Sequence, residues 1–142
     1  MVVDDEPTVR NAIKRLLEHA GYIVDTADGG EPALELLAKK AFDLVVTDFS
    51  MPGMHGDQLV AKIRQTNPNQ RIIMATAFVE EYKVFGQATA PVDALLLKPF
   101  SLQELHEAIA RAMAREDAPQ WEAAPRTITG QQPTEDIPPP HE

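Results

Sequence analysis

Short apolar runs alternate with segments of helical periodicity along the first 116 residues. The strand-like runs lie at residues 1–3, 22–24, 43–47, 71–75 and 94–97. Between and after them, apolar residues recur every three or four positions, which is typical of helices with one buried face. Strands that alternate with helices favour a parallel sheet covered on both faces, because parallel strands need crossover connections. The pattern predicts a single α/β domain, an open five-stranded parallel sheet between two helical layers.

Local signals mark where the predicted helices begin and end. The first helix begins near Pro7 and stops at Gly21. Its predicted buried face consists of Val9, Ala12, Ile13, Leu16, Leu17 and Ala20. The last helix begins with a capping box formed by Ser101 and Glu104. Its predicted buried face consists of Leu105, Ala108, Ile109, Ala112 and Met113. Residues 80–90 predict a weaker helix, because glycine and threonine lower the helix propensity.

The composition changes near residue 116. Residues 117–142 hold 6 of the 12 prolines, and they carry five acidic residues against one basic residue. Their large apolar residues are the isolated Trp121, Ile128 and Ile137. Such a segment buries too little surface to offset its chain entropy. We therefore expect a folded domain over 1–116 and an acidic, proline-rich, disordered tail over 117–142.

Charge and composition exclude several classes of protein. The chain has 13 basic and 22 acidic residues and a net charge of −9, which disfavours direct binding to nucleic acid. The absence of cysteine excludes disulfides, thiolate metal sites and cysteine nucleophiles. No apolar stretch approaches the roughly 18 residues of a membrane span, and no secretion signal opens the chain. We therefore expect a cytoplasmic protein with no membrane contact.

Polar residues follow four of the five predicted strands. Asp4 and Asp5 follow the first strand, Asp48 the third, Thr76 the fourth and Lys98 the fifth. In an open parallel sheet, ligands bind outside the carboxyl ends of the strands, where the strand order reverses. If the order is 2-1-3-4-5, the first and third strands are neighbours at that point, and the three carboxylates converge.

Three gathered carboxylates repel one another and raise one another's pKa unless cations compensate them. Lys98 supplies one positive charge, and Mg²⁺, which prefers a few carboxylates plus phosphate oxygens, would supply two more. Phosphoryl transfer needs mainly positioning and charge neutralisation, with a carboxylate as nucleophile. The hydroxyl of Thr76 would donate a hydrogen bond there. The residues indicate a Mg²⁺ site with room for a phosphoryl group.

Each of these residues also has a purely structural interpretation. Asp4 and Asp5 would cap the first helix, Asp48 would be a turn residue, Thr76 would be structural and Lys98 would be a surface residue. The joint occurrence of all of them at the same end of successive strands favours the functional interpretation.

The same residues lie in motifs that closely resemble the receiver domain of two-component response regulators. The matching stretches are residues 2–7 (VVDDEP), 43–56 (DLVVTDFSMPGMHG), 74–77 (MATA) and 97–100 (LKPF). The resemblance covers about residues 1–116. It implies a flavodoxin-like (βα)5 sandwich with strand order 2-1-3-4-5.

The resemblance also implies a role for each acidic residue. Asp48 would accept a phosphoryl group from the phosphohistidine of a sensor histidine kinase. Asp5, Asp48 and the backbone carbonyl of Ser50 would bind Mg²⁺ directly, and Asp4 would act through bound water. The domain would be a phosphoacceptor that assists its own phosphotransfer and dephosphorylation, not a conventional enzyme.

Further residues have implied roles in switching. Thr76 would move onto the acyl phosphate, and Lys98 would pair with it, next to a cis bond to Pro99. Ser50 and Phe78 occupy positions that tune dephosphorylation in relatives. The expected partners are the kinase and either a histidine phosphotransfer protein or a downstream effector. The expected state is a monomer or a weak dimer.

Two departures from the family pattern leave alternatives open. Leu95 stands where relatives usually carry an aromatic residue, so an interaction module that works without phosphorylation is one alternative. The first strand is also shorter than usual, and the natural start is expected upstream or the fold only marginally stable. A phosphatase of the haloacid dehalogenase type is a further alternative, but it needs a second aspartate where Ser50 stands.

Overall fold

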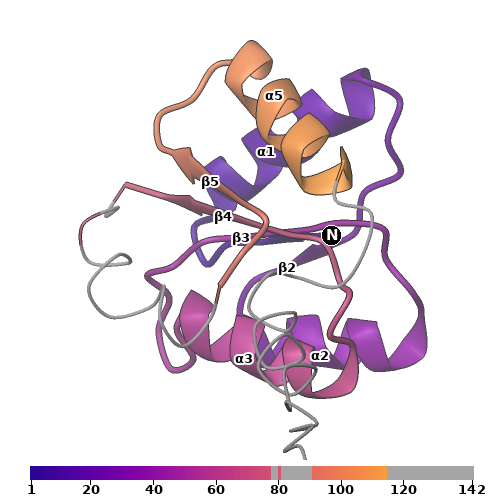
Figure 1. Cartoon of the computed structure of the whole chain (residues 1–142). Helices are drawn as coiled ribbons and strands as arrows, with labels where there is room; N and C mark the ends of the chain where they lie inside the picture. The colour runs from indigo at the N-terminus through magenta and orange to yellow at the C-terminus, as the bar shows by residue number, and fades with distance from the viewer. Residues whose placement is uncertain (78–79, 81–90, 115–142) are drawn as a thin grey trace, which may run out of the picture.

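Five parallel strands form one sheet in the order β2-β1-β3-β4-β5 (Figure 1). The strands are β1 (Val2–Val3), β2 (Thr26–Ala27), β3 (Val45–Thr47), β4 (Ile72–Thr76) and β5 (Ala94–Leu97). The computed structural model describes residues 1–77, 80 and 91–114. Within them the predicted strand order is confirmed, and the order reverses between β1 and β3. Three predictions concern residues outside this described part of the chain. They are the role of Phe78, the helix expected over 80–90 (of which only residue 80 is described) and the tail over 117–142.

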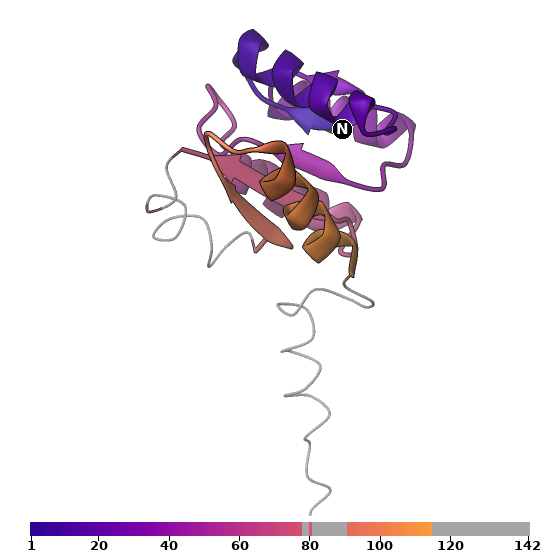
Figure 2. The same cartoon turned by 90° about the horizontal axis from the view of Figure 1, so that it is seen from above.

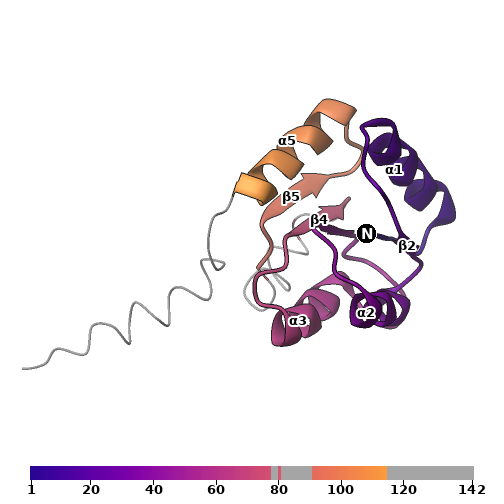
Figure 3. The ribbon, with the colours of Figure 1, turned by 90° about the vertical axis from the view of Figure 1, so that its right-hand side faces the viewer.

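Helices cover both faces of the sheet. They are α1 (Pro7–His19), α2 (Gly30–Lys39), α3 (Gly56–Thr66) and α5 (Leu102–Ala114). Figures 1 and 3 show α1 and α5 on one face and α2 and α3 on the other, and Figure 2 looks onto the α1–α5 layer. None of these described helices is long and apolar enough to cross a bilayer.

The strands divide the core into two apolar clusters, because successive side chains point to opposite faces. Val3, Val45 and Met74 pack with α2 and α3, whereas Val2 and Val46 pack with α1 and α5. The central strands are buried on both faces, as the continuous apolar runs predict.

Helix ends follow the sequence signals. Pro7 lies in the first turn of α1, and Gly21, just beyond its end, has a φ of 98°, a conformation that glycine adopts without strain. The capping box of α5 is formed: the amide of Glu104 donates to Ser101 Oγ at 3.1 Å, and the amide of Ser101 donates to Glu104 Oε2 at 3.4 Å. The bond between Lys98 and Pro99 is cis.

The second strand lies later than the apolar pattern predicts. The strand is Thr26–Ala27, whereas Tyr22 and Ile23 are exposed, so the prediction of a strand over 22–24 was wrong. The register pairs Val2 with Thr26 and Val3 with Ala27, so residues 22–24 lie outside the described pairing of β1 with β2. The third strand also begins later than predicted, at Val45 instead of Asp43.

Some positions in the first and last helices that were predicted to face the core are exposed. Ala12 and Ala20 of the first helix pattern face solvent, because α1 contacts the sheet along a narrow stripe centred on Ile13 and Leu17. Met113 is 45% exposed, although the rest of the predicted α5 face is buried. Met113 instead lines a groove at the amino end of the strands.

This groove, the base groove, has a volume of about 460 Å³ and lies beside the start of β1. Its apolar walls include Leu17, Val24, Leu44, Ile109 and Met113. Because side chains alternate, a residue placed directly before Met1 would share the face of Val2 and enter this groove.

A buried ion pair ties the starts of β4 and β5 to α3. Oδ2 of Asp93 accepts the amide of Ile72 at 2.7 Å and lies 3.4 Å from Nη2 of Arg64. Both charged side chains are only 5% exposed. Nη1 of Arg64 also donates to the carbonyls of Pro68 and Gln70, which satisfies much of the buried charge.

We predict that an apolar extension ahead of Met1 stabilises the fold. A valine–isoleucine–valine extension would continue β1 between β2 and β3, and a fully buried side chain of this size contributes about 1.5–3 kcal/mol. The melting temperature should rise by several degrees in thermal unfolding followed by circular dichroism. A serine–glycine–serine extension is the control, and an equal melting temperature for both extensions would contradict the prediction.

Candidate functional site

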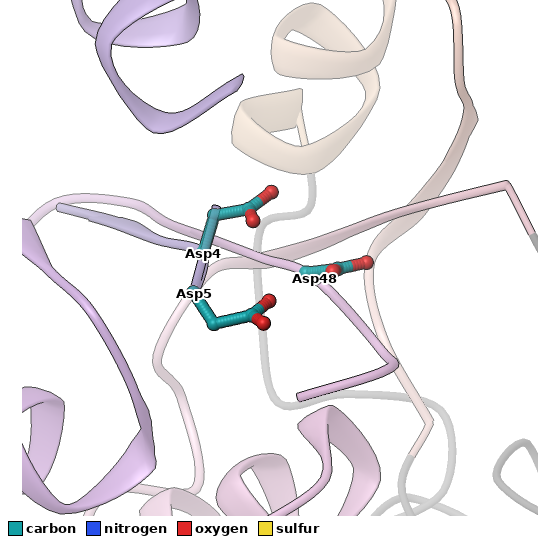
Figure 4. Close-up of side chains that lie close together, drawn as sticks. All are labelled: Asp4, Asp5 and Asp48. Atoms are coloured by element: carbon teal, nitrogen blue, oxygen red, sulfur yellow. The ribbon is translucent and has the colours of Figure 1, made fainter. Parts of the chain in front are cut away.

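Three carboxylates meet at the carboxyl edge of the sheet (Figure 4). Asp4 and Asp5 follow β1 and Asp48 follows β3, and one oxygen from each lies within 4.8 Å of the others. Asp4 is buried, Asp48 is half-buried and Asp5 is exposed. The convergence expected for neighbouring first and third strands is therefore present.

Backbone pairing holds these carboxylates in place. The amide of Asp48 donates to the carbonyl of Val3 at 2.9 Å, and the amide of Asp4 donates to the carbonyl of Ala27 at 3.2 Å. Oδ1 of Asp4 accepts the amide of Glu6 at 2.9 Å, directly before α1. Asp4 thus orders the backbone directly ahead of α1 and also faces the site, but the expectation that it caps the helix was wrong, because the N-cap residue is Glu6 and no side-chain capping bond is formed there.

Lys98 is the cation among these carboxylates. Its Nζ lies 2.6 Å from Oδ2 of Asp4 and 3.5 Å from Oδ1 of Asp48. The Lys98 amide donates to the carbonyl of Thr76 at 2.9 Å, which places the lysine directly beyond β5. One ammonium group faces three carboxylates, so two negative charges lack a compensating charge within this group.

The pKa of Asp48 is raised above its usual value of 3.8. Burial is the largest cause, and the charge of Asp4 adds to it. Lys98 and the hydrogen bond that Oδ1 accepts from the Phe49 amide act in the opposite direction. The ionised form of Asp48 is therefore destabilised in the folded protein until a further cation arrives.

The two other predicted site residues lie on the same edge. Thr76 ends β4 and is fully buried, next to the end of β3. Ser50 lies two residues after Asp48 and is exposed. The contact of the Ser50 carbonyl with a metal and the movement of the Thr76 hydroxyl stay predictions.

Two residues at the site were missed in the sequence. Gly56 begins α3, and its amide donates to the carbonyl of Phe49 at 2.7 Å. A Cβ atom there would lie 2.1 Å from the backbone oxygen of Asp48, which no real side chain tolerates. Arg10 donates to the carbonyl of Asp4 at 2.8 Å from the first turns of α1. Two features of the sequence could have indicated these roles. Gly56 stands at a junction between a loop and a helix, and Arg10 is a basic residue that closely follows the acidic pair Asp4 and Asp5.

Loop residue Met54 joins this edge to α2. Its side chain covers Gly30 so closely that a Cβ on the glycine would lie 2.4 Å from the sulfur. The loop after Asp48 is thus fixed at one end by Gly56 and contacts α2 through Met54.

The donor set fits Mg²⁺. Carboxylate oxygens are the hard ligands that this ion prefers, and it commonly keeps waters and uses only a few protein ligands. Asp5 and Asp48 are more accessible to a metal than Asp4. The two carboxylate oxygens of Asp4 already accept hydrogen bonds from the Glu6 amide and the Lys98 ammonium group.

Gly56→Ala should displace the Asp48 backbone and destabilise the protein. Overpacking of this kind costs about 1–3 kcal/mol, which denaturant titration measures. Gly29→Ala is the matched control, because the added Cβ has its nearest contact at 3.9 Å. Equal losses for the two variants would contradict the proposed contact with Asp48.

Asp48→Asn should raise the melting temperature at neutral pH in the presence of EDTA. A raised folded-state pKa means that the wild type loses stability as the pH rises through that pKa, and asparagine removes this loss. The gain should shrink as the pH falls below the pKa. Exposed Asp43, before β3, provides the control variant Asp43→Asn. A gain that is absent or independent of pH would refute the electrostatic explanation.

Comparison with known proteins identifies the family. A family model described as the response regulator receiver domain matches residues 1–110. The chain is 36% identical over 118 residues to chemotaxis protein CheY-3 of Vibrio cholerae, covering 81% of this chain and 91% of the relative. It is equally identical over 118 residues to CheY of Pseudomonas aeruginosa, covering 81% and 95%.

Solved structures agree with the sequence comparison. The response regulator protein TrrA from Thermotoga maritima, in complex with Mg²⁺ and BeF, has 35% identity and a TM-score of 0.71, covering 78% of this chain and 95% of that one. CheY4 of Vibrio cholerae has 30% identity and a TM-score of 0.73, covering 78% and 94%. The chain therefore belongs to the response regulator receiver domain family of two-component systems and has its flavodoxin-like fold.

Proposed function

We propose that Asp48 is the phosphoacceptor of a two-component phosphorelay. Receiver domains are signalling domains, not conventional enzymes, and the acidic cluster is the observation that carries this proposal. A carboxylate oxygen of Asp48 would attack the phosphorus of a phosphohistidine. The phosphorus–nitrogen bond breaks, an acyl phosphate forms and the imidazole leaves, taking up a proton.

Mg²⁺ would be held by Asp5 and Asp48 together with the carbonyl of Ser50. When bound, the ion neutralises charge on the cluster and on the phosphoryl oxygens. Asp4 would act through bound water, because its Oδ1 already accepts the Glu6 amide and its Oδ2 accepts Lys98. In the TrrA structure, Mg²⁺ and BeF are bound to a relative of this fold.

Lys98 would exchange partners during phosphorylation. Its Nζ lies closer to Asp4 than to Asp48, so the nucleophile is the less strongly paired of the two carboxylates. A phosphoryl group on Asp48 would bring new anionic oxygens within reach of the ammonium group. The hydrogen bond that the Lys98 backbone amide donates to the carbonyl of Thr76 would keep the lysine at the site throughout.

Thr76 would report the change by donating its hydroxyl to the acyl phosphate. Leu95 pairs in register with Met74, two residues before Thr76, and packs with the α2–α3 core cluster. A leucine here has no ring to reorient, so the conformational signal to a protein partner would pass through the backbone after Thr76. The upstream partner would be a sensor histidine kinase, and the downstream partner a histidine phosphotransfer protein or an effector.

Intact-mass analysis after incubation with acetyl phosphate and Mg²⁺ tests the proposal. The wild type should gain the mass of one phosphoryl group, and Asp48→Asn should gain none. Asp5→Asn should label more slowly and need more Mg²⁺, because one of the proposed metal ligands is lost. Asp43→Asn, the same substitution at the other end of the β3 segment, should label like the wild type.

Persistent labelling of Asp48→Asn would show that another residue is the acceptor. A wild type that binds Mg²⁺ but gains no mass from acetyl phosphate or from phosphorylated kinases would favour the interaction module that works without phosphorylation.

A further inference from the structure

A second groove lies between α2 and α3, on the face of the molecule opposite α1 and α5. This α2–α3 groove has a volume of about 630 Å³. Its floor is apolar and is formed by Leu34 and Leu37 of α2 and Ile63 of α3. Lys39 stands on the α2 wall and Lys62 on the α3 wall, and both are exposed.

The groove is basic on an acidic protein. Among the described residues that line it, three are lysines and none is acidic, although the whole chain has a net charge of −9. Lys40 is already engaged by an ion pair with Asp25 and by the ring of Phe42, 5.3 Å from its Nζ. Lys39 faces Glu35 one helical turn earlier, an exposed pairing that is weak in water. The groove therefore combines an apolar floor with positive walls.

We propose that the acidic segment 117–142 of this chain docks in the α2–α3 groove. The segment carries five acidic residues and one basic residue. Glu135 and Asp136 stand next to Ile137, which is followed by three prolines. The carboxylates match the lysines, and the isoleucine matches the apolar floor. Proline has fewer accessible backbone conformations than other residues, which lowers the entropy lost on docking.

The covalent connection allows this contact. Each helix returns from the carboxyl edge of the sheet, so α2, α3 and α5 all end at the amino edge. Glu135 follows Ala114, the last residue of α5, by 21 residues, a reach of roughly 70 Å when extended. A domain of this size has a radius of gyration of about 13 Å. Tethering gives effective concentrations on the order of millimolar, so weak individual contacts suffice.

The base groove is a poorer site for this segment. It is closer to the end of α5, because Met113 lines it, but its charged side chains are Asp25, Asp43 and Lys40, and Lys40 is paired with Asp25. Two acidic side chains against one lysine do not attract an acidic segment, whereas Lys39 and Lys62 of the α2–α3 groove do. Charge therefore selects between two apolar grooves at the same edge of the sheet.

Paramagnetic relaxation in the full chain tests the docking. The chain has no cysteine, so Thr134→Cys accepts a single nitroxide label beside Glu135. Amide signals of residues 37–41 and 62–67 should lose more than half of their intensity relative to the reduced label. About 0.5 M NaCl should restore them, since exposed charges are screened there. Lys39→Glu combined with Lys62→Glu should also restore them.

Lys14→Glu combined with Arg15→Glu is the matched control, because it makes the same charge change on α1. This control should leave the broadening of residues 37–41 and 62–67 unchanged. Broadening that is absent, spread evenly or centred on the base groove would overturn the proposal. Equal broadening in a mixture of ¹⁵N-labelled unmodified chain and unlabelled spin-labelled chain would assign the contact to a second copy and also overturn it.

Discussion

The parallel pairing of β1 with β3 is the constraint on which the site depends. Val3 lies opposite Thr47, so the chain leaves both strands at the same edge and brings the acidic pair next to Asp48. The cluster is electrostatically incomplete, because the ammonium group of Lys98 faces three carboxylates. This shortfall of positive charge, created by strand order, is what suits the edge to a divalent cation and an anionic substrate.

Much of the site could be predicted because it depends on few rules. A residue that follows a buried strand lies at the carboxyl edge whatever the details of packing, and this placed Asp48, Thr76 and Lys98 correctly on that edge. The capping box of α5 depends on residues three apart, and it formed as predicted. Both inferences depend only on which residues are near one another in the sequence, so no knowledge of the packing between elements was needed.

The features that were missed depend on distances between elements. The importance of Gly56 comes from the close approach of α3 to the Asp48 backbone, and no periodicity encodes this approach. Arg64 is charged and lies on the amphipathic helix α3, yet it is buried. Its burial is tolerated because the carboxylate of Asp93, directly before β5, pairs with its guanidinium group. The position of β2 was misjudged because the register with β1 decides which residues form the strand, and the apolar run at 22–24 carries no information about that register.

The base groove gives the sheet a gradient of stability along its strands. At the carboxyl edge, the central strand is held on both sides by hydrogen bonds from Asp4 and Asp48. At the amino edge, the base groove leaves apolar side chains such as Val24, Leu44 and Met113 only partly covered. Hydrogen exchange in such a sheet would begin at the amino edge and advance towards the carboxylates, as local opening starts where contacts are fewest. The chemistry thus lies at the end of the sheet that opens last.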